Sequence, residues 1–230
     1  PLPYELAYAV ADATRIESVP VQLKGDPAKP GTVVPRRFLT VLGGAVLPHG
    51  DTTSGRRQLA DWIADPANPL TARVMVNRVW MHHFGKGIVA SPGDFGQLGS
   101  QPTHPELLDW LAGEFVRNGW SLKQLHRLIM TSRTYRQAST RDDKRDQIDP
   151  DNLYLSRMNV RRLEAETLRD SLLAISGKLN PKIGGPPVPV MFNEEGQVVI
   201  GIDTTDTAGR PTGKVIPMDG DEFRRSIYVQ

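Results

Sequence analysis

The sequence predicts a mainly α fold, with a compact core of about five helices, irregular loops and a few short β-strands toward both ends. Residues 55–177 carry apolar side chains at helical spacing, bounded by residues that favour helix ends. Glycine and proline divide the flanking residues 1–50 and 178–230 into short β-prone runs. We therefore expect a single domain over residues 1–230, with an irregular lead-in, a helical core and a loop- and strand-rich tail.

Composition limits the function classes. Of the 230 residues, 39% are hydrophobic, which is enough to bury a core of ordinary domain size. The net charge of +2 indicates no chain-wide surface for nucleic acid or acidic membrane. Without cysteine the chain has no disulfide, thiolate nucleophile or attachment point for c-type haem. We see no signal-peptide pattern and expect no membrane span. Its abrupt ends suggest a fragment of a longer chain.

Helices occupy the first part of the core. "RRQLADWIAD" (56–65) predicts a short helix that ends before Pro66. "PLTARVMVNRVWMHHFG" (69–85) predicts the next helix. Pro69 lies in its first turn and Gly85 just past its last, which are the helix ends that these two residue types prefer.

A helical pair follows. Thr103 and Glu106 have the spacing of a capping box and predict the start of a helix that Gly119 ends. Ser121 then predicts the cap of another helix, with Gln124 at its third position. So short a turn predicts two helices that pack against each other.

The remaining segments are predicted to form a loop, a further helix and short strands. The charged stretch 139–152 predicts a solvated loop, and residues 159–177 predict a helix capped by Asn159. "VPVQLKG" (19–25) and "RRSIYV" (224–229) predict short strands.

Polar residues interrupt the apolar stripe of the helix in 69–85. Arg73 and Asn77 lie on its apolar side, where an unpaired charge would cost several kcal/mol. They indicate either a buried structural network, which we favour, or a clamp for an anion or carboxylate. Candidate acidic partners for Arg73 are Asp94, Asp109, Glu164, Glu166 and Asp170.

Two adjacent histidines, His82 and His83, end the same helix. Neighbouring residues on a helix point about 100° apart, so the two rings do not readily chelate one ion, and we expect no metal site from this pair. His82 shares a face with Arg78, and His83 borders the apolar side. The predicted binding residues of this helix are Arg73, Asn77, Arg78, Trp80, His82 and His83.

His104 is the best acid–base candidate. At the start of a helix the dipole favours its neutral ring, and Glu106 and Asp94 are near in sequence. These three are the catalytic candidates, although a structural role at the helix end is the more common one for such a histidine. A hydrolase or redox enzyme would need Arg73 and Asn77 to converge with them in one pocket.

The basic helix expected over residues 121–136 leaves a third interpretation open. It carries Lys123, Arg127, Arg133 and Arg136 after a short turn, which is the outline of a DNA-recognition element. Its leucines also face a core, so we do not favour nucleic acid. No nucleotide-binding glycine motif and no nucleophile elbow is present.

The stretch from "RRQLADWIADPANPL" through "VMVNRVWMHHFGKGIVASPGDFGQLGSQPTHPELLDWLAGEF" to "TYRQAS" resembles domain of unknown function 1553. "NLYLSRMNVRRLEAETLRDSLLAISGKL" and "FRRSIYV" resemble flanking signatures of that family. The resemblance implies a mostly helical domain in large exported bacterial proteins, extracytoplasmic, beside a planctomycete-type cytochrome c domain and domain of unknown function 1549. It implies haem c in neighbouring domains but none here, since C-x-x-C-H is absent.

The resemblance supplies no catalytic residue. Our leading hypothesis is therefore a module without demonstrable catalysis that binds a partner, a surface or a polysaccharide. Other domains of the same polypeptide, or a separate protein, are the expected partners.

Overall fold

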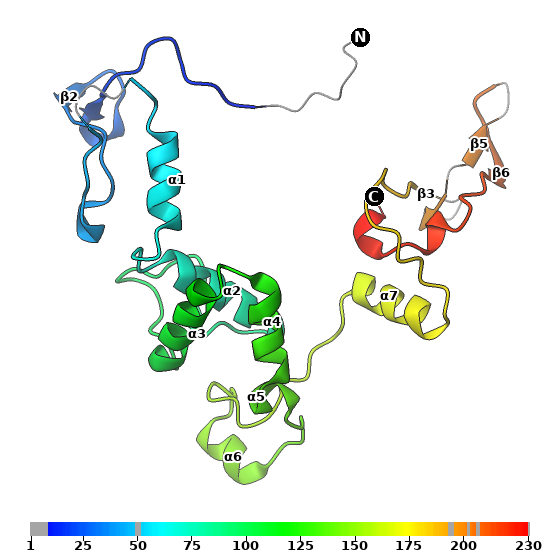
Figure 1. Cartoon of the computed structure of the whole chain (residues 1–230). Helices are drawn as coiled ribbons and strands as arrows, with labels where there is room; N and C mark the ends of the chain where they lie inside the picture. Colours follow the sequence, from blue (N-terminus) through cyan, green and yellow to red (C-terminus); the bar gives the residue numbers. More distant parts are fainter. Residues whose placement is uncertain (1–8, 49–51, 193–195, 202, 206–207, 230) are drawn as a thin grey trace. The chain divides into compact units, whose positions relative to one another are not determined.

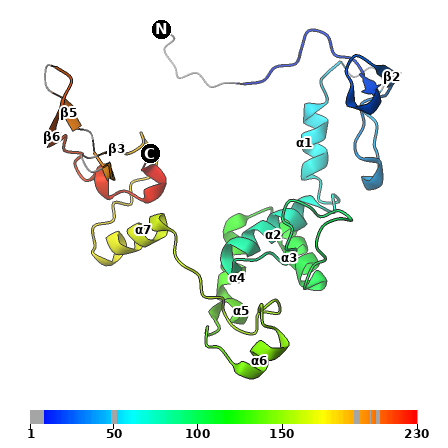
Figure 2. The same cartoon turned by 180° about the vertical axis from the view of Figure 1, so that it is seen from behind.

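The structure of the chain, a computed structural model, describes residues 9–48, 52–192, 196–201, 203–205 and 208–229. It divides into two compact units, Pro1–Asn159 and Val160–Gln230. Helices dominate, and the strands form short pairs toward the two ends of the chain (Figures 1 and 2), so the prediction of a mainly α fold is confirmed. That all 230 residues act as one domain stays a prediction.

The first unit contains β1 (Pro20–Gln22), β2 (Pro30–Val33), α1 (Arg56–Ala64), α2 (Thr71–Phe84), α3 (Pro105–Arg117), α4 (Leu122–Thr131), α5 (Arg133–Arg136) and α6 (Asp143–Ile148). The second unit contains α7 (Ala165–Ile175), β3 (Val190–Phe192), β4 (Val198–Ile200), β5 (Asp203–Thr205) and β6 (Pro211–Val215). Each successive pair of strands is an antiparallel hairpin. No helix in the described ranges is both long and apolar enough to cross a membrane.

The core of the first unit lies where α2, α3 and α4 pack side by side, as both views of the cartoon show (Figures 1 and 2). Two aromatic contacts brace it. The rings of Trp80 and Phe84 stack with their centroids 4.2 Å apart, and Phe115 meets Trp120 edge to face at 5.3 Å. The buried apolar residues are Ala72, Val76, Val79, Trp80, Phe84, Ile88, Val89, Leu108, Leu111, Ala112, Phe115, Leu125 and Ile129.

Predicted helix ends position these three helices. Gly85 ends α2 in the left-handed conformation, with φ of 88°, and its N–H donates to the Met81 carbonyl. Gly119 is left-handed after α3, and the Ser121 hydroxyl caps α4 by accepting from the Gln124 N–H at 3.3 Å. These end signals are local, so they could be predicted from sequence alone.

The predicted capping box at Thr103 is wrong. Helix α3 begins at Pro105 and its N-cap is His104, so Glu106 lies in the first turn without a reciprocal partner at Thr103. Thr103 instead fastens the loop before α3: its N–H and its hydroxyl both donate to the Ile88 carbonyl, at 2.9 and 3.3 Å. The hydroxyl is used for loop attachment rather than for capping.

The basic helix expected over 121–136 is broken at Ser132. This residue has an extended backbone, with ψ of 153°, and its hydroxyl accepts from the Tyr135 N–H to start α5. The loop predicted over 139–152 contains α6, capped by the Asp142 carboxylate. Both corrections come from serine and aspartate caps within polar segments.

The helix predicted over 159–177 is shorter than expected, because α7 begins at Ala165. Asn159 is no cap: its amide donates to the Phe84 carbonyl at 2.9 Å and holds the end of the first unit against α2. Residues 226–228 of the predicted last strand form a 3₁₀ turn, η4 (Ser226–Tyr228).

Helix α7 and η4 are joined in the second unit by polar contacts. The Asp170 carboxylate accepts from the Ser226 N–H at 2.8 Å and from its hydroxyl at 2.7 Å. Arg169 donates to the carbonyls of Glu222 and Arg224, at 2.6 and 2.9 Å. The acid–arginine pair of α7 is therefore a structural link to the last segment of the chain.

Candidate functional site

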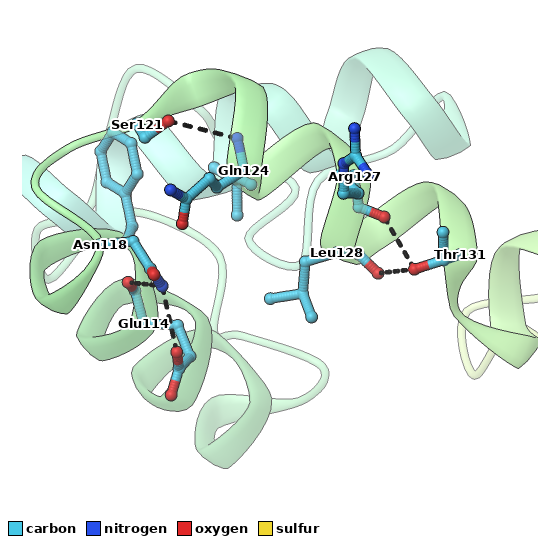
Figure 3. A pocket seen from close by; sticks show the side chains of 9 residues that line it. Glu114, Asn118, Ser121, Gln124, Arg127, Leu128 and Thr131 are labelled. Atoms are coloured by element: carbon cyan, nitrogen blue, oxygen red, sulfur yellow. Dashed lines mark hydrogen bonds between the residues drawn. The ribbon is translucent and has the colours of Figure 1, made fainter.

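A groove of about 400 Å³ lies between α3 and α4 (Figure 3). Phe115, Leu125 and Leu128 give it an apolar floor, and its sides carry amide, hydroxyl, carboxylate and guanidinium groups. The polar lining residues are Glu114, Asn118, Ser121, Gln124, Arg127 and Thr131. A hollow of this kind suits a ligand that offers both C–H surface and hydrogen-bonding groups.

Several groups around the groove are held in place by hydrogen bonds, drawn as dashed lines in Figure 3. The Asn118 amide donates to the Glu114 carbonyl at 2.8 Å and to its carboxylate at 3.2 Å. Arg117 also donates to that carboxylate. The Thr131 hydroxyl donates to the Arg127 carbonyl at 2.8 Å. The side chains of Asn118, Glu114 and Thr131 are therefore positioned before any ligand arrives.

Two lining groups form no hydrogen bond or ion pair with the described residues: the Gln124 carboxamide and the Arg127 guanidinium. Figure 3 shows the Gln124 side chain directed into the space between the helices, opposite Asn118. Their hydrogen-bonding capacity is met by solvent and is available to a ligand without breaking an internal contact.

Trp110 extends this face of α3. It lies one turn before Glu114 and two turns before Asn118, so the three residues share one side of the helix. The side chain is large and apolar, yet 49% of the residue is exposed. An exposed indole beside a polar groove supplies a flat surface on which a ligand can stack.

Arg73 is paired outside the apolar core. Its Nε lies 2.6 Å from Oδ1 of Asp109, one of the predicted partners, and its Nη1 donates to the Pro69 carbonyl at 2.6 Å. The side chain is 35% exposed, so it lies at the edge of the apolar stripe rather than inside it. Arg73 and Asp109 line a separate cavity of about 340 Å³, with Phe95.

The hydrogen bond from Arg73 and its positive charge hold the pKa of Asp109 below its ordinary value of 3.8, against a smaller effect of burial. Asp109 is therefore ionised at neutral pH. It can accept hydrogen bonds but has no proton to give as a general acid.

Asn77 is fully buried and clamps the loop that follows α2. Its amide nitrogen donates to the Val89 carbonyl at 2.9 Å, and its amide oxygen accepts from the Val89 N–H at 2.8 Å. Gly87 allows this approach, because a Cβ there would lie 2.5 Å from the Val89 carbonyl oxygen. Asn77 is thus positioned as a structural brace.

The catalytic candidates predicted from the sequence lie in different surroundings. The Asp94 carboxylate accepts from the Gly96 N–H at 2.8 Å and shapes an exposed turn. Glu106 is exposed on α3. His104 lines a small cavity of about 40 Å³ with Trp80, and its Nδ1 lies 2.9 Å from the Thr103 hydroxyl. Arg73 and His104 therefore line different cavities.

The two adjacent histidines point to different environments. His82 is exposed, whereas Nε2 of His83 lies 2.7 Å from Nδ1 of His126 on α4. Arg78 is exposed and borders an apolar groove that includes Met75. Sequence reasoning missed His126, because it is 43 residues away and nothing in its neighbourhood distinguishes it.

Metal-ligating side chains do not gather into larger groups: over the described ranges, no three or more histidine or carboxylate side chains are placed to hold one ion. The groove between α3 and α4 offers hydrogen bonds and apolar contact. Its carboxylate, from Glu114, is engaged by two neighbours.

These features fall within a recognised family. The model of PSD1, described as a protein of unknown function (DUF1553), matches residues 55–230. The chain belongs to the DUF1553 family. The matched region includes α1 to α7, and so both the groove and the histidine pair. No curated protein and no solved structure matches the chain.

Proposed function

We propose that this DUF1553 chain is a non-catalytic module that binds a polysaccharide in the groove between α3 and α4. The observation that carries the proposal is the combination of an apolar floor with the free Gln124 and Arg127 side chains. An extracytoplasmic setting beside a cytochrome c domain follows from the resemblance of the sequence to domains of large exported proteins.

Sugar polymers match this surface in chemistry. Each hydroxyl of a sugar donates and accepts, as does the Gln124 carboxamide, while Arg127 donates only. The C–H faces of sugar rings are apolar and pack on indole and leucine surfaces such as those of Trp110 and Leu128. The groove and the indole together extend along α3 for two turns, which suits a chain of linked sugars better than a single small molecule.

The same residues do not support hydrolysis of the polymer. Glycoside hydrolysis uses two carboxyl groups, one of them protonated, on opposite sides of the scissile bond. Among the groove-lining residues Glu114 is the carboxylate, and it accepts from Asn118 and Arg117. Hydrogen bonds of this kind favour the ionised form, so the group is arranged as an acceptor.

Binding of the purified chain to neutral and acidic polysaccharides, measured by affinity electrophoresis and isothermal titration calorimetry, tests the proposal. We expect Trp110→Ala and Gln124→Ala each to weaken binding about tenfold or more, because each removes a large part of the contact surface. Phe192→Ala, an exposed aromatic of the second unit, and Gln147→Ala, an exposed amide of α6, are matched controls and should bind normally.

Two outcomes contradict the proposal. One is binding that persists unchanged in both groove variants. The other is the appearance of new reducing ends during incubation, which would identify the chain as a hydrolase.

Nucleic acid is the second candidate, because residues 121–141 contain five basic side chains and no acidic one. Lys123, Arg133 and Arg136 form no ion pair with described residues. A nucleic-acid surface predicts affinity for duplex DNA that falls steeply with salt concentration, as counterion release requires. A flat or absent response to salt removes this candidate.

A further inference from the structure

A pair of histidines joins two core helices outside the groove. His83 lies in the last turn of α2 and His126 in the middle of α4, and both are half-buried. Nε2 of His83 faces Nδ1 of His126 at 2.7 Å, with the ring planes 72° apart. Tyr135 packs edge-on against His83, with the ring centroids 5.4 Å apart. Two ring nitrogens thus face each other across one hydrogen bond.

We propose that His83 and His126 form an exchangeable site for a divalent transition-metal ion, Cu²⁺ or Zn²⁺. Neutral imidazole nitrogens are ligands that both ions prefer. No third histidine or carboxylate joins the pair within the described ranges, so water completes the coordination. Two protein ligands make an open site from which the ion exchanges, unlike a closed structural zinc site.

The geometry requires a small adjustment. With metal–nitrogen bonds of about 2.0–2.1 Å and tetrahedral angles, two ligating nitrogens lie roughly 3.3 Å apart. The rings must therefore separate by roughly 0.6 Å, which small side-chain rotations supply. The backbones beneath them are held by buried neighbours: Phe84 follows His83, and Leu125 and Ile129 flank His126. The two ligands are consequently close together before the ion binds, and only their rings need to move.

Electrostatics and proton balance allow a metal ion to replace the proton that the two rings share. His83 is at the carboxyl end of α2, where the helix dipole stabilises positive charge. In the hydrogen-bonded pair one of the two facing nitrogens carries the shared proton. When an ion binds, that proton leaves to solvent and the same ring takes up a proton on its other nitrogen. The number of protons on the pair is unchanged, and the site gains the charge of the ion.

Titration of the full chain with CuCl₂ or ZnCl₂ tests the inference. We expect one ion bound per chain and, at a metal concentration 100 times Kd, a rise in melting temperature of roughly 5–10 °C by far-UV circular dichroism. Cu²⁺ should show electron paramagnetic resonance splitting from two nitrogens. His83→Gln and His126→Gln, which keep polarity and approximate size, should each remove the ion and the thermal shift. His82→Gln, the exposed neighbour, should retain both.

Retained one-to-one binding in His83→Gln or His126→Gln overturns the proposal, as does loss of binding in His82→Gln. Circular dichroism of the metal-free variants tests whether they are folded. If either glutamine variant is unfolded, the electron paramagnetic resonance spectrum of Cu²⁺ bound to the wild-type chain provides the test. The absence of splitting from nitrogen in that spectrum would contradict the proposed site. Polysaccharide binding is measured separately, so neither result depends on the other.

Discussion

Replacing Asn77 with alanine removes the only side chain that the structure shows holding the Val89 backbone from α2. Asn77 is fully buried and Val89 is 3% exposed. Both polar groups of the Val89 peptide lose a partner together, because the same amide side chain donates to the carbonyl and accepts from the N–H. The loop from Gly85 to Thr103 then loses this side-chain attachment to α2.

The magnitude follows from these two contacts. A buried donor or acceptor left without a partner costs about 1–3 kcal/mol. Two such groups would cost about 2–6 kcal/mol, and water entering the vacated space recovers part of it. We expect Asn77→Ala to lower the free energy of unfolding by about 3 kcal/mol, or the melting temperature by roughly 6–12 °C.

Urea unfolding followed by tryptophan fluorescence measures this change. All four tryptophans, Trp62, Trp80, Trp110 and Trp120, belong to the first unit, so the signal reports the unit that contains Asn77. Gln97→Ala, an exposed amide on the same loop, is the control and should change the free energy by less than about 0.5 kcal/mol. If Asn77→Ala is as stable as this control, Asn77 is not a brace.

Three further predictions concern single contacts. Ser121→Ala removes the cap that accepts from the Gln124 N–H and should destabilise the first unit by about 1 kcal/mol in the same urea assay, whereas Ser121→Asp should not. Asp109→Asn should cost less than about 1 kcal/mol at neutral pH, because its ion pair with Arg73 is exposed. Since the pKa of Asp109 is lowered from 3.8, the stabilisation by this ion pair is present above pH 3.8 and should disappear as the pH falls below that value. Urea titrations of the wild type and Asp109→Asn at several pH values measure it. A difference in unfolding free energy between the two proteins that stays unchanged at low pH would contradict this prediction. Arg224 donates to the carbonyls of Pro186 and Gly184 and covers the ring of Tyr228. A lysine cannot do all of this at once, so Arg224→Lys should destabilise the second unit by about 3 kcal/mol and speed its amide hydrogen exchange. Unchanged exchange would refute this prediction.

The sequence predicts most clearly what neighbouring residues determine. Gly85, Gly119 and Ser121 act on backbone groups within a few residues, and the helix ends they predict are present. Thr103 and Asn159 have the same local signals but form longer-range bonds instead, to Ile88 and Phe84. A capping residue that finds a tertiary partner no longer marks a helix end.

The candidate site was harder to predict for a related reason. The sequence predicts that Asn77 and Arg73 need partners, and Asp109 is among the acids that it offers to Arg73; the structure confirms that pairing. The partnership of His83 with His126 and the groove between α3 and α4 arise from the packing of separate helices. The spacing of residues along one helix carries no information about which face of another helix those residues will contact.

The central claim is that the groove between α3 and α4 binds a polysaccharide without transforming it. Titrating an isotope-labelled chain with a polysaccharide that binds it, and following backbone amide shifts by NMR, tests this most directly. Our account predicts shift changes concentrated in residues 110–131, with the spectrum of the sugar free of new anomeric signals. Changes centred instead on the cavity of Arg73 and Asp109, or new anomeric signals from a cleaved polymer, would contradict it.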